Sequence, residues 1–177
     1  MWKVSLVGHS QVPQDLSVPG TEIRIFRGTG GKASDFYTDS RMNGVLEWQH
    51  DLCILWLGSN DINKNSNPQE IANNIIQIVE QIEKDCQAVV RVCLVEPRFY
   101  PNEEYMTDED YRKVQSSVNR KLQRRLANEF IHFNSSSWVE ELSGDGVHWN
   151  DTGKFKVTNK LRRAIKHFMM DSDSSST

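Results

Sequence analysis

One segment constrains the fold more than any other. It reads Leu52-Cys53-Ile54-Leu55-Trp56-Leu57 and ends at Gly58. Six consecutive apolar residues lack the alternation of a half-exposed strand, and they are too few for a typical helix. A strand of this kind is usually covered on both faces, as in a parallel sheet between two layers of helices. The run therefore predicts a central strand of an α/β domain.

The rest of the chain alternates between strand-like and helix-like segments. Further strands are expected at residues 2–7, 22–26, 88–95 and 130–133. Between them, apolar residues recur at helical spacing in three stripes. The stripes are Ile71, Ile75, Ile78, Val79 and Ile82, then Tyr111, Val114, Val118, Leu122 and Leu126, then Val157, Leu161, Ile165 and Phe168. This alternation favours right-handed crossovers, and it predicts a three-layer α/β sandwich with a mostly parallel sheet of about five strands.

The composition narrows the class of protein. The 177 residues suit one domain, which we expect to span residues 1–170, with a polar and disordered tail at residues 171–177. A net charge of −3 provides no basic field for nucleic acid. Three cysteines, an odd number in apolar or helical surroundings, argue against a disulfide framework. Since the start of the chain also lacks a leader-like segment, we expect an intracellular, cytoplasmic protein.

Four short polar segments follow predicted strands or precede the last helix. They are Gly8-His9-Ser10, Gly28-Thr29-Gly30-Gly31, Gly58-Ser59-Asn60-Asp61 and Asp145-Gly146-Val147-His148. In an open α/β sheet, ligands bind outside the carboxyl ends of the strands. We therefore expect these segments, although distant in sequence, to meet at one edge of the sheet.

Together the segments hold the groups needed for acyl transfer. Ser10 is the candidate nucleophile, and a serine hydroxyl needs a base to take its proton. His148 is that candidate base, and Asp145 would bind the other imidazole nitrogen and fix its tautomer. The backbone N–H groups of Ser10 and Gly31 and the side-chain amide of Asn60 would stabilise the oxyanion. This chemistry needs no metal and no organic cofactor.

The order Gly-x-Ser, Gly-Gly, Gly-x-Asn-Asp and Asp-x-x-His resembles the four blocks of the SGNH (GDSL-like) hydrolases. The resemblance runs from about residue 4 to residue 168, and it implies a flavodoxin-like sandwich and esterase activity. Ser10, Gly31, Asn60 and His148 would be the residues that name the family, with Asp145 completing the triad. One departure concerns the first block, because His9 stands where the family usually has Asp.

A narrower resemblance rests on the particular residues within these blocks. The segment Trp56 to Ile62, together with Val147-His148-Trp149-Asn150 and the Gly-His-Ser block, is similar to the esterase domain of first-open-reading-frame proteins of LINE-type retrotransposons. This resemblance implies hydrolysis of short acyl or lipid esters inside a larger protein. Nucleic acid would then be bound mainly by other segments of that protein.

Two surfaces carry alternative interpretations. The loop from Arg98 to Tyr105 follows the fourth predicted strand, so we expect Phe99 and Tyr105 to shape an acyl pocket, unless the segment is an ordinary surface loop. Basic side chains cluster on the last two helices. They are Arg120, Lys121, Arg124, Arg125, Lys154, Lys156, Lys160, Arg162, Arg163 and Lys166. A solvated helix face explains them, and a basic surface that approaches anionic lipid or nucleic acid is the alternative.

Other chemistries have weaker support. Asp145 and His148 form a candidate metal pair, but the sequence has no His-Glu-x-x-His motif and no Cys/His cluster to complete it. Residues 28–33 loosely fit a dinucleotide fingerprint, yet they follow the second strand rather than the first. The main alternative to an esterase is a non-catalytic module on the same fold that binds acyl or lipid groups.

Overall fold

The computed structural model describes residues 1–28, 31–36, 40–99, 106–133 and 138–175. Its centre is a parallel sheet of five strands in the order β2-β1-β3-β4-β5. The strands are β1 (Trp2–His9), β2 (Thr21–Gly28), β3 (Leu52–Trp56), β4 (Val89–Cys93) and β5 (Phe130–Ile131). This order is that of flavodoxin-like folds, so the predicted fold class is confirmed.

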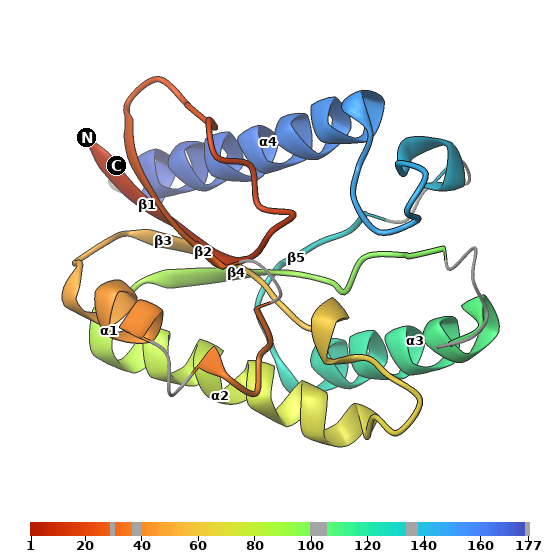
Figure 1. The fold of residues 1–177 in the computed structure, drawn as a ribbon. Helices are drawn as coiled ribbons and strands as arrows, with labels where there is room; N and C mark the ends of the chain where they lie inside the picture. Colours follow the sequence, from red (N-terminus) through yellow and green to blue (C-terminus); the bar gives the residue numbers. More distant parts are fainter. Residues whose placement is uncertain (29–30, 37–39, 100–105, 134–137, 176–177) are drawn as a thin grey trace.

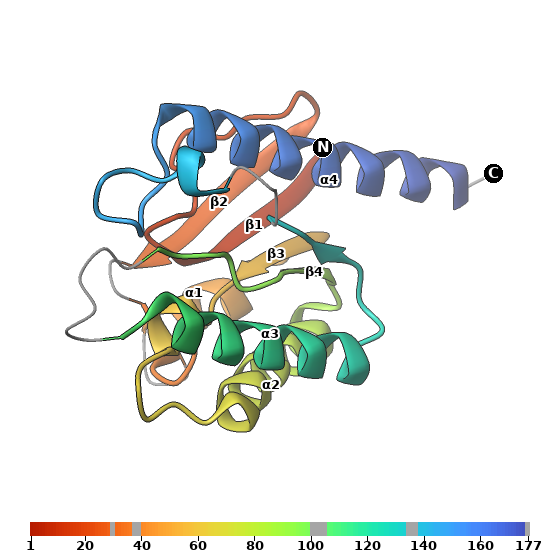
Figure 2. The same cartoon turned by 90° about the vertical axis from the view of Figure 1, so that its right-hand side faces the viewer.

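Helices cover both faces of the sheet, which gives three layers (Figures 1 and 2). Helix α4 (Asp151–Ser175) lies along one face. The other face carries α1 (Ser40–Glu47), α2 (Pro68–Cys86) and α3 (Asp108–Arg125). Two short 3₁₀ helices, η2 (Ser59–Asp61) and η3 (Trp138–Glu141), lie in the connections.

The apolar run of β3 contributes to both cores, as its sequence predicted. Leu52, Ile54 and Trp56 pack in the core beneath α4. Cys53 and Leu55 point to the opposite face and join the core beneath α2 and α3. Since all five side chains are buried, this strand has no solvent-facing side and shows no alternation of polar and apolar residues.

Capping residues set the start of helices α2 and α3. The Asn67 side chain accepts a hydrogen bond of 2.9 Å from the backbone N–H of Gln69, and Pro68 is the first helical residue. Helix α3 is capped in the same way by Thr107, which accepts from the N–H of Asp110 at 3.1 Å. These side chains satisfy N–H groups that have no partner inside the helix.

Strand β4 ends at Cys93, two residues before its apolar pattern stops. Helix α3 takes over the hydrogen bonding of the backbone that follows. Asn119 binds both the N–H and the carbonyl of Val95, and Gln115 donates to the same carbonyl at 2.9 Å. The Tyr111 hydroxyl donates to the Glu96 carbonyl at 2.8 Å. After Leu94, whose N–H still donates to the Ile131 carbonyl of β5 at 3.0 Å, the extended segment leading to Glu96 is therefore held by helix α3.

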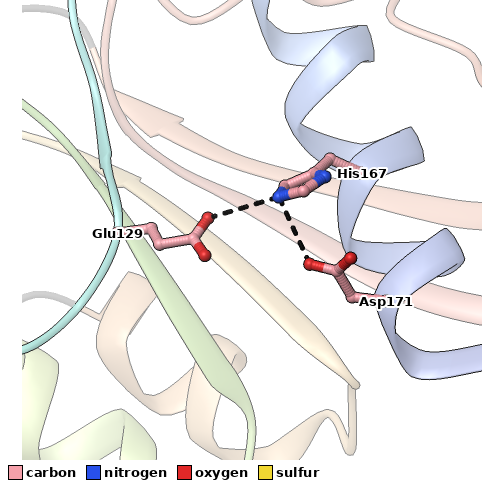
Figure 3. A group of neighbouring side chains, drawn as sticks. All are labelled: Glu129, His167 and Asp171. Atoms are coloured by element: carbon pink, nitrogen blue, oxygen red, sulfur yellow. Dashed lines mark ion pairs between the residues drawn. The ribbon is translucent and has the colours of Figure 1, made fainter. Parts of the chain in front are cut away.

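The disordered tail that we predicted at residues 171–177 is wrong for residues 171–175, which continue helix α4. No break in secondary structure marks the boundary expected at residue 170. His167 pairs with Asp171 at 3.2 Å on the next turn, and it lies 3.9 Å from Glu129 (Figure 3). Glu129 is also paired with Arg91 at 2.9 Å. These exposed ion pairs tie the helix to the loop before β5.

No helix among the described residues is long and apolar enough to span a membrane. Cys53, Cys86 and Cys93 are buried free thiols. Burial raises the pKa of the Cys53 thiol to about 12. A thiol in this state is a poor nucleophile.

Candidate active site

Ser10 and His148 line the same cavity, which has a volume of about 630 Å³. Ser10 directly follows the end of β1, and His148 lies in the loop before α4. Ser10 is half-buried and His148 is exposed, so both groups are accessible from this cavity. The fold thus brings together two side chains that are far apart in the sequence.

A side-chain hydrogen bond joins the two loops that carry Ser10 and His148. The Gln11 amide Nε2 donates to the Val147 carbonyl at 2.5 Å. On the other side of the Ser10 loop, Arg27 of β2 donates to the carbonyls of Ser10 at 3.2 Å and Val12 at 2.8 Å. Sequence reasoning missed both Gln11 and Arg27, because their partners are backbone atoms that no motif identifies.

Asp145 binds His148 as the spacing of the two residues predicted. Its Oδ2 lies 2.6 Å from His148 Nδ1. Its Oδ1 accepts from the backbone N–H groups of Val147 and His148 and from the Ser143 hydroxyl, at 2.8–3.0 Å. Partial burial raises the pKa of this carboxyl, but the hydrogen bonds from His148, Val147 and Ser143 outweigh it and hold the pKa far below its usual range. Asp145 is therefore a carboxylate that binds His148 through Nδ1, and no described residue is hydrogen-bonded to His148 Nε2.

Asn60 lies beside the Gly31 loop. Its amide Nδ2 donates to the Gly31 carbonyl at 3.0 Å. The neighbouring Asp61 accepts from the N–H groups of Ala33 at 2.8 Å and Ser34 at 3.2 Å. Burial raises the pKa of Asp61, and the hydrogen bonds from Ala33 and Ser34 oppose that rise. The Asn-Asp pair that follows β3 thus anchors the loop that follows β2.

The Gly31 N–H donates to the Gly28 carbonyl at 3.1 Å. For Gly31 to serve as an oxyanion donor, as predicted, this bond must be shared or broken. The Asn60 Nδ2 group carries two N–H bonds. Among the described residues its only acceptor is the Gly31 carbonyl, so the second N–H has no partner there.

The loop after β4 is only partly as expected. The predicted substrate-facing segment begins at Arg98, but this side chain is buried and turned inward, where it donates to Asn60 Oδ1. Phe99 is 37 % exposed, and its N–H donates to the Gly146 carbonyl at 2.9 Å. Phe99 therefore lies against the loop that carries Asp145 and His148, although it does not line the cavity. Tyr105 lies outside the described residues.

The buried groups behind the site were not predicted by any motif. His9, Glu96 and Arg98 form a cluster beneath the ends of β1, β3 and β4. Only the departure at His9 pointed to this region, and the carboxylate that it faces, Glu96, lies 87 positions further along the sequence.

Comparison of the sequence with protein families gives a match to the GDSL-like lipase/acylhydrolase family over residues 7–154. The chain belongs to this family. The resemblance inferred from the four blocks is therefore confirmed, and family membership places the chain among carboxylic ester hydrolases. Comparison with curated proteins gives no significant match.

Solved structures of esterases share the fold. A lipase/acylhydrolase from Enterococcus faecalis superposes with a TM-score of 0.76 at 15 % identity, covering 94 % of this chain and 96 % of that one. An acetyl xylan esterase gives 0.73 at 20 % identity, covering 92 % and 99 %. Est24, a carbohydrate acetylesterase from Sinorhizobium meliloti, gives 0.69 at 17 % identity, covering 95 % and 100 %. At these identities the likeness concerns the fold.

Proposed function

We propose that this GDSL-like protein is a serine esterase in which Ser10, His148 and Asp145 form the triad. The observation that carries the proposal is the shared cavity of Ser10 and His148, with Asp145 Oδ2 at 2.6 Å from His148 Nδ1. The oxyanion would be held by the Ser10 N–H, the Gly31 N–H and the Asn60 amide.

The reaction runs in two steps. Ser10 Oγ attacks the ester carbonyl carbon, and its proton passes to His148 Nε2. The bond from carbon to the alcohol oxygen then breaks, and His148 returns the proton to the leaving alcohol. Water attacks the acyl-enzyme with His148 again as the base, which releases the acid and restores Ser10. Asp145 stabilises the imidazolium in both steps.

We propose acyl esters as the substrate class, with acetyl, other short acyl and lipid esters as members to be distinguished. Two of the similar structures are an acetyl xylan esterase and a carbohydrate acetylesterase. The cavity beside Ser10 is lined by polar and charged side chains as well as apolar ones, including Gln14, Arg27 and Lys154. A mixed lining of this kind suits a polar alcohol better than a long acyl chain.

The particular residues of the motifs support a proposal about the larger protein to which the domain belongs. We propose that the domain acts in the cytoplasm as part of a retrotransposon-encoded protein, whose other segments bind nucleic acid. Contact of the basic helix α4 with a membrane surface belongs to the same hypothesis.

The experiment combines turnover with active-site labelling. We expect the parent to hydrolyse p-nitrophenyl acetate and to be labelled by a fluorophosphonate probe, with both lost in Ser10→Ala. Ser17→Ala is the matched control, because Ser17 is exposed and lies outside the cavity. Hydrolysis by Ser10→Ala at the parent rate contradicts the mechanism. A parent that binds acyl compounds without turnover or labelling supports the alternative, a non-catalytic acyl-binding module.

A further inference from the structure

A carboxylate with no access to solvent lies directly behind the candidate active site. Glu96 is 0 % exposed. Its Oε2 accepts from the Trp56 indole N–H at 2.9 Å, and its Oε1 lies 3.2 Å from His9 Nε2 and 3.8 Å from Arg98 Nη2. Burial raises the pKa of Glu96, but the neighbouring His9 ring, the charge of Arg98 and a hydrogen bond from Ser59 outweigh it and hold the pKa far below its usual range. A charge in this position is costly unless it is paired, so its retention calls for a role.

The His9 ring connects Glu96 to the loop of the nucleophile. His9 directly precedes Ser10, and its Nδ1 accepts from the Gln11 N–H at 3.2 Å. A ring nitrogen that accepts in this way carries no proton, so a proton on the ring belongs to Nε2, which faces Glu96. Glu96 thus lies 3.2 Å from the ring that accepts the Gln11 N–H, next to Ser10.

Arg98 connects the same carboxylate to Asn60. Its Nη2 donates to Asn60 Oδ1 and to Ser59 Oγ, each at 2.8 Å. A carboxamide can rotate by 180° and exchange its oxygen and nitrogen, but the guanidinium of Arg98 can donate only to the amide oxygen, so Oδ1 must face it. Nδ2 is then directed to the Gly31 carbonyl and the oxyanion position. Arg98 itself is buried, with a relative exposure of 7 %.

We propose that Arg98 and Glu96 are positioning residues of the esterase. Arg98 holds the Asn60 amide in the orientation that donates to the oxyanion, and Glu96 holds Arg98 and His9 in register with each other. This inference rests on the proposed function, because it assigns Asn60 to the oxyanion. It also explains the departure at residue 9, where a carboxylate in place of His9 would face Glu96.

The test is a double-mutant cycle between Arg98 and Asn60. A lysine at position 98 keeps the charge, but it replaces the fixed planar NH₂ group of Nη2, which donates to both acceptors, with a freely rotating ammonium. Since misplacing a catalytic group by about 1 Å costs on the order of 10²-fold in rate, we expect Arg98→Lys to lower kcat by about 10- to 100-fold with KM changed little. In an Asn60→Ala background, the same change should lower kcat by less than about twofold, because its target is gone. Equal losses of kcat in both backgrounds would overturn the proposal.

Arg91→Lys is the matched control. Arg91 lies in the middle of β4 and is paired with Glu129, the residue before β5, and neither lines the cavity, so we expect kcat to be unchanged. If Arg98→Lys does not fold, as judged by circular dichroism, the double variant Glu96→Gln/Arg98→Met removes both charges together. It should fold and show the same dependence on Asn60.

A second readout separates this inference from the esterase proposal. The side-chain NH₂ protons of Asn60, identified in the NMR spectrum by their loss in Asn60→Ala, should exchange with solvent slowly in the parent and at least about tenfold faster in Arg98→Lys, because the orienting bond is lost. Unchanged exchange overturns the positioning role. A parent that hydrolyses no ester refutes the proposed function, and in that case the exchange measurement still decides the role of Arg98.

Discussion

Replacing His9 with the aspartate that its family usually carries is the most informative single change. In this chain His9→Asp places a second carboxylate opposite the fully buried Glu96, whose Oε1 now lies 3.2 Å from the ring nitrogen. The shorter side chain would put the two charges about 5 Å apart, and with an effective dielectric constant of about 20 their repulsion is about 3 kcal/mol. That is a large share of the stability of a single domain, which is typically about 5–15 kcal/mol.

Urea unfolding of four proteins measures this effect: the parent, His9→Asp, Glu96→Gln and the double variant. We expect His9→Asp to lose about 3 kcal/mol at pH 7, and the double variant to recover most of that loss because a neutral amide faces the new carboxylate. In His9→Asp the like charges raise the pKa of the pair above its unfolded value. The folded protein then binds protons more readily than the unfolded one, so the deficit should shrink as the pH falls from 7 toward 4.

The parent should behave in the opposite sense. Its Glu96 has a lowered pKa, so the stability that this group contributes is present above the unfolded pKa and is lost as the pH falls through the folded pKa. A His9→Asp variant as stable as the parent at pH 7 would refute the pairing of His9 with Glu96. So would a deficit that Glu96→Gln does not relieve.

Three further changes test the site and its frame. Asp145→Asn should lower kcat by about 10³- to 10⁴-fold without changing the circular dichroism spectrum, because the imidazole loses its orienting carboxylate; a change in KM alone would contradict this role. Asp61→Ala should lower the free energy of unfolding in urea by about 1–3 kcal/mol, because the N–H groups of Ala33 and Ser34 lose their acceptor. Parent-like stability would show that the loop after β2 does not depend on Asp61. Gly8→Ala should lower the melting temperature, because an added Cβ would lie 2.2 Å from the Trp56 carbonyl oxygen. Overpacking of this kind costs about 1–3 kcal/mol. An unchanged Tm would mean that β1 and β3 move apart at this point without loss of stability.

The elements that the sequence predicted are those with a strong local signal. The apolar run of β3 and the long stripe of α2 each bury one continuous set of side chains, so pattern and structure coincide. Helix α1 was missed because its eight residues bury only Met42 and Val45, too few to form a period. The end of α4 was missed because Asp171 reads as a polar tail until its partner His167, one turn earlier, is considered.

The candidate site was also predicted only in part from the sequence. The sequence by itself determined that Asp145 can reach His148, because three residues in one short loop span the distance, and that Ser10, Gly31 and Asn60 follow successive segments of a parallel sheet. Only the tertiary structure decided that Ser10 and His148 share a cavity and that Glu96 and Arg98 lie behind them. Local contacts follow from spacing along the chain, whereas these contacts depend on strand order and side-chain direction, which packing of the whole domain sets.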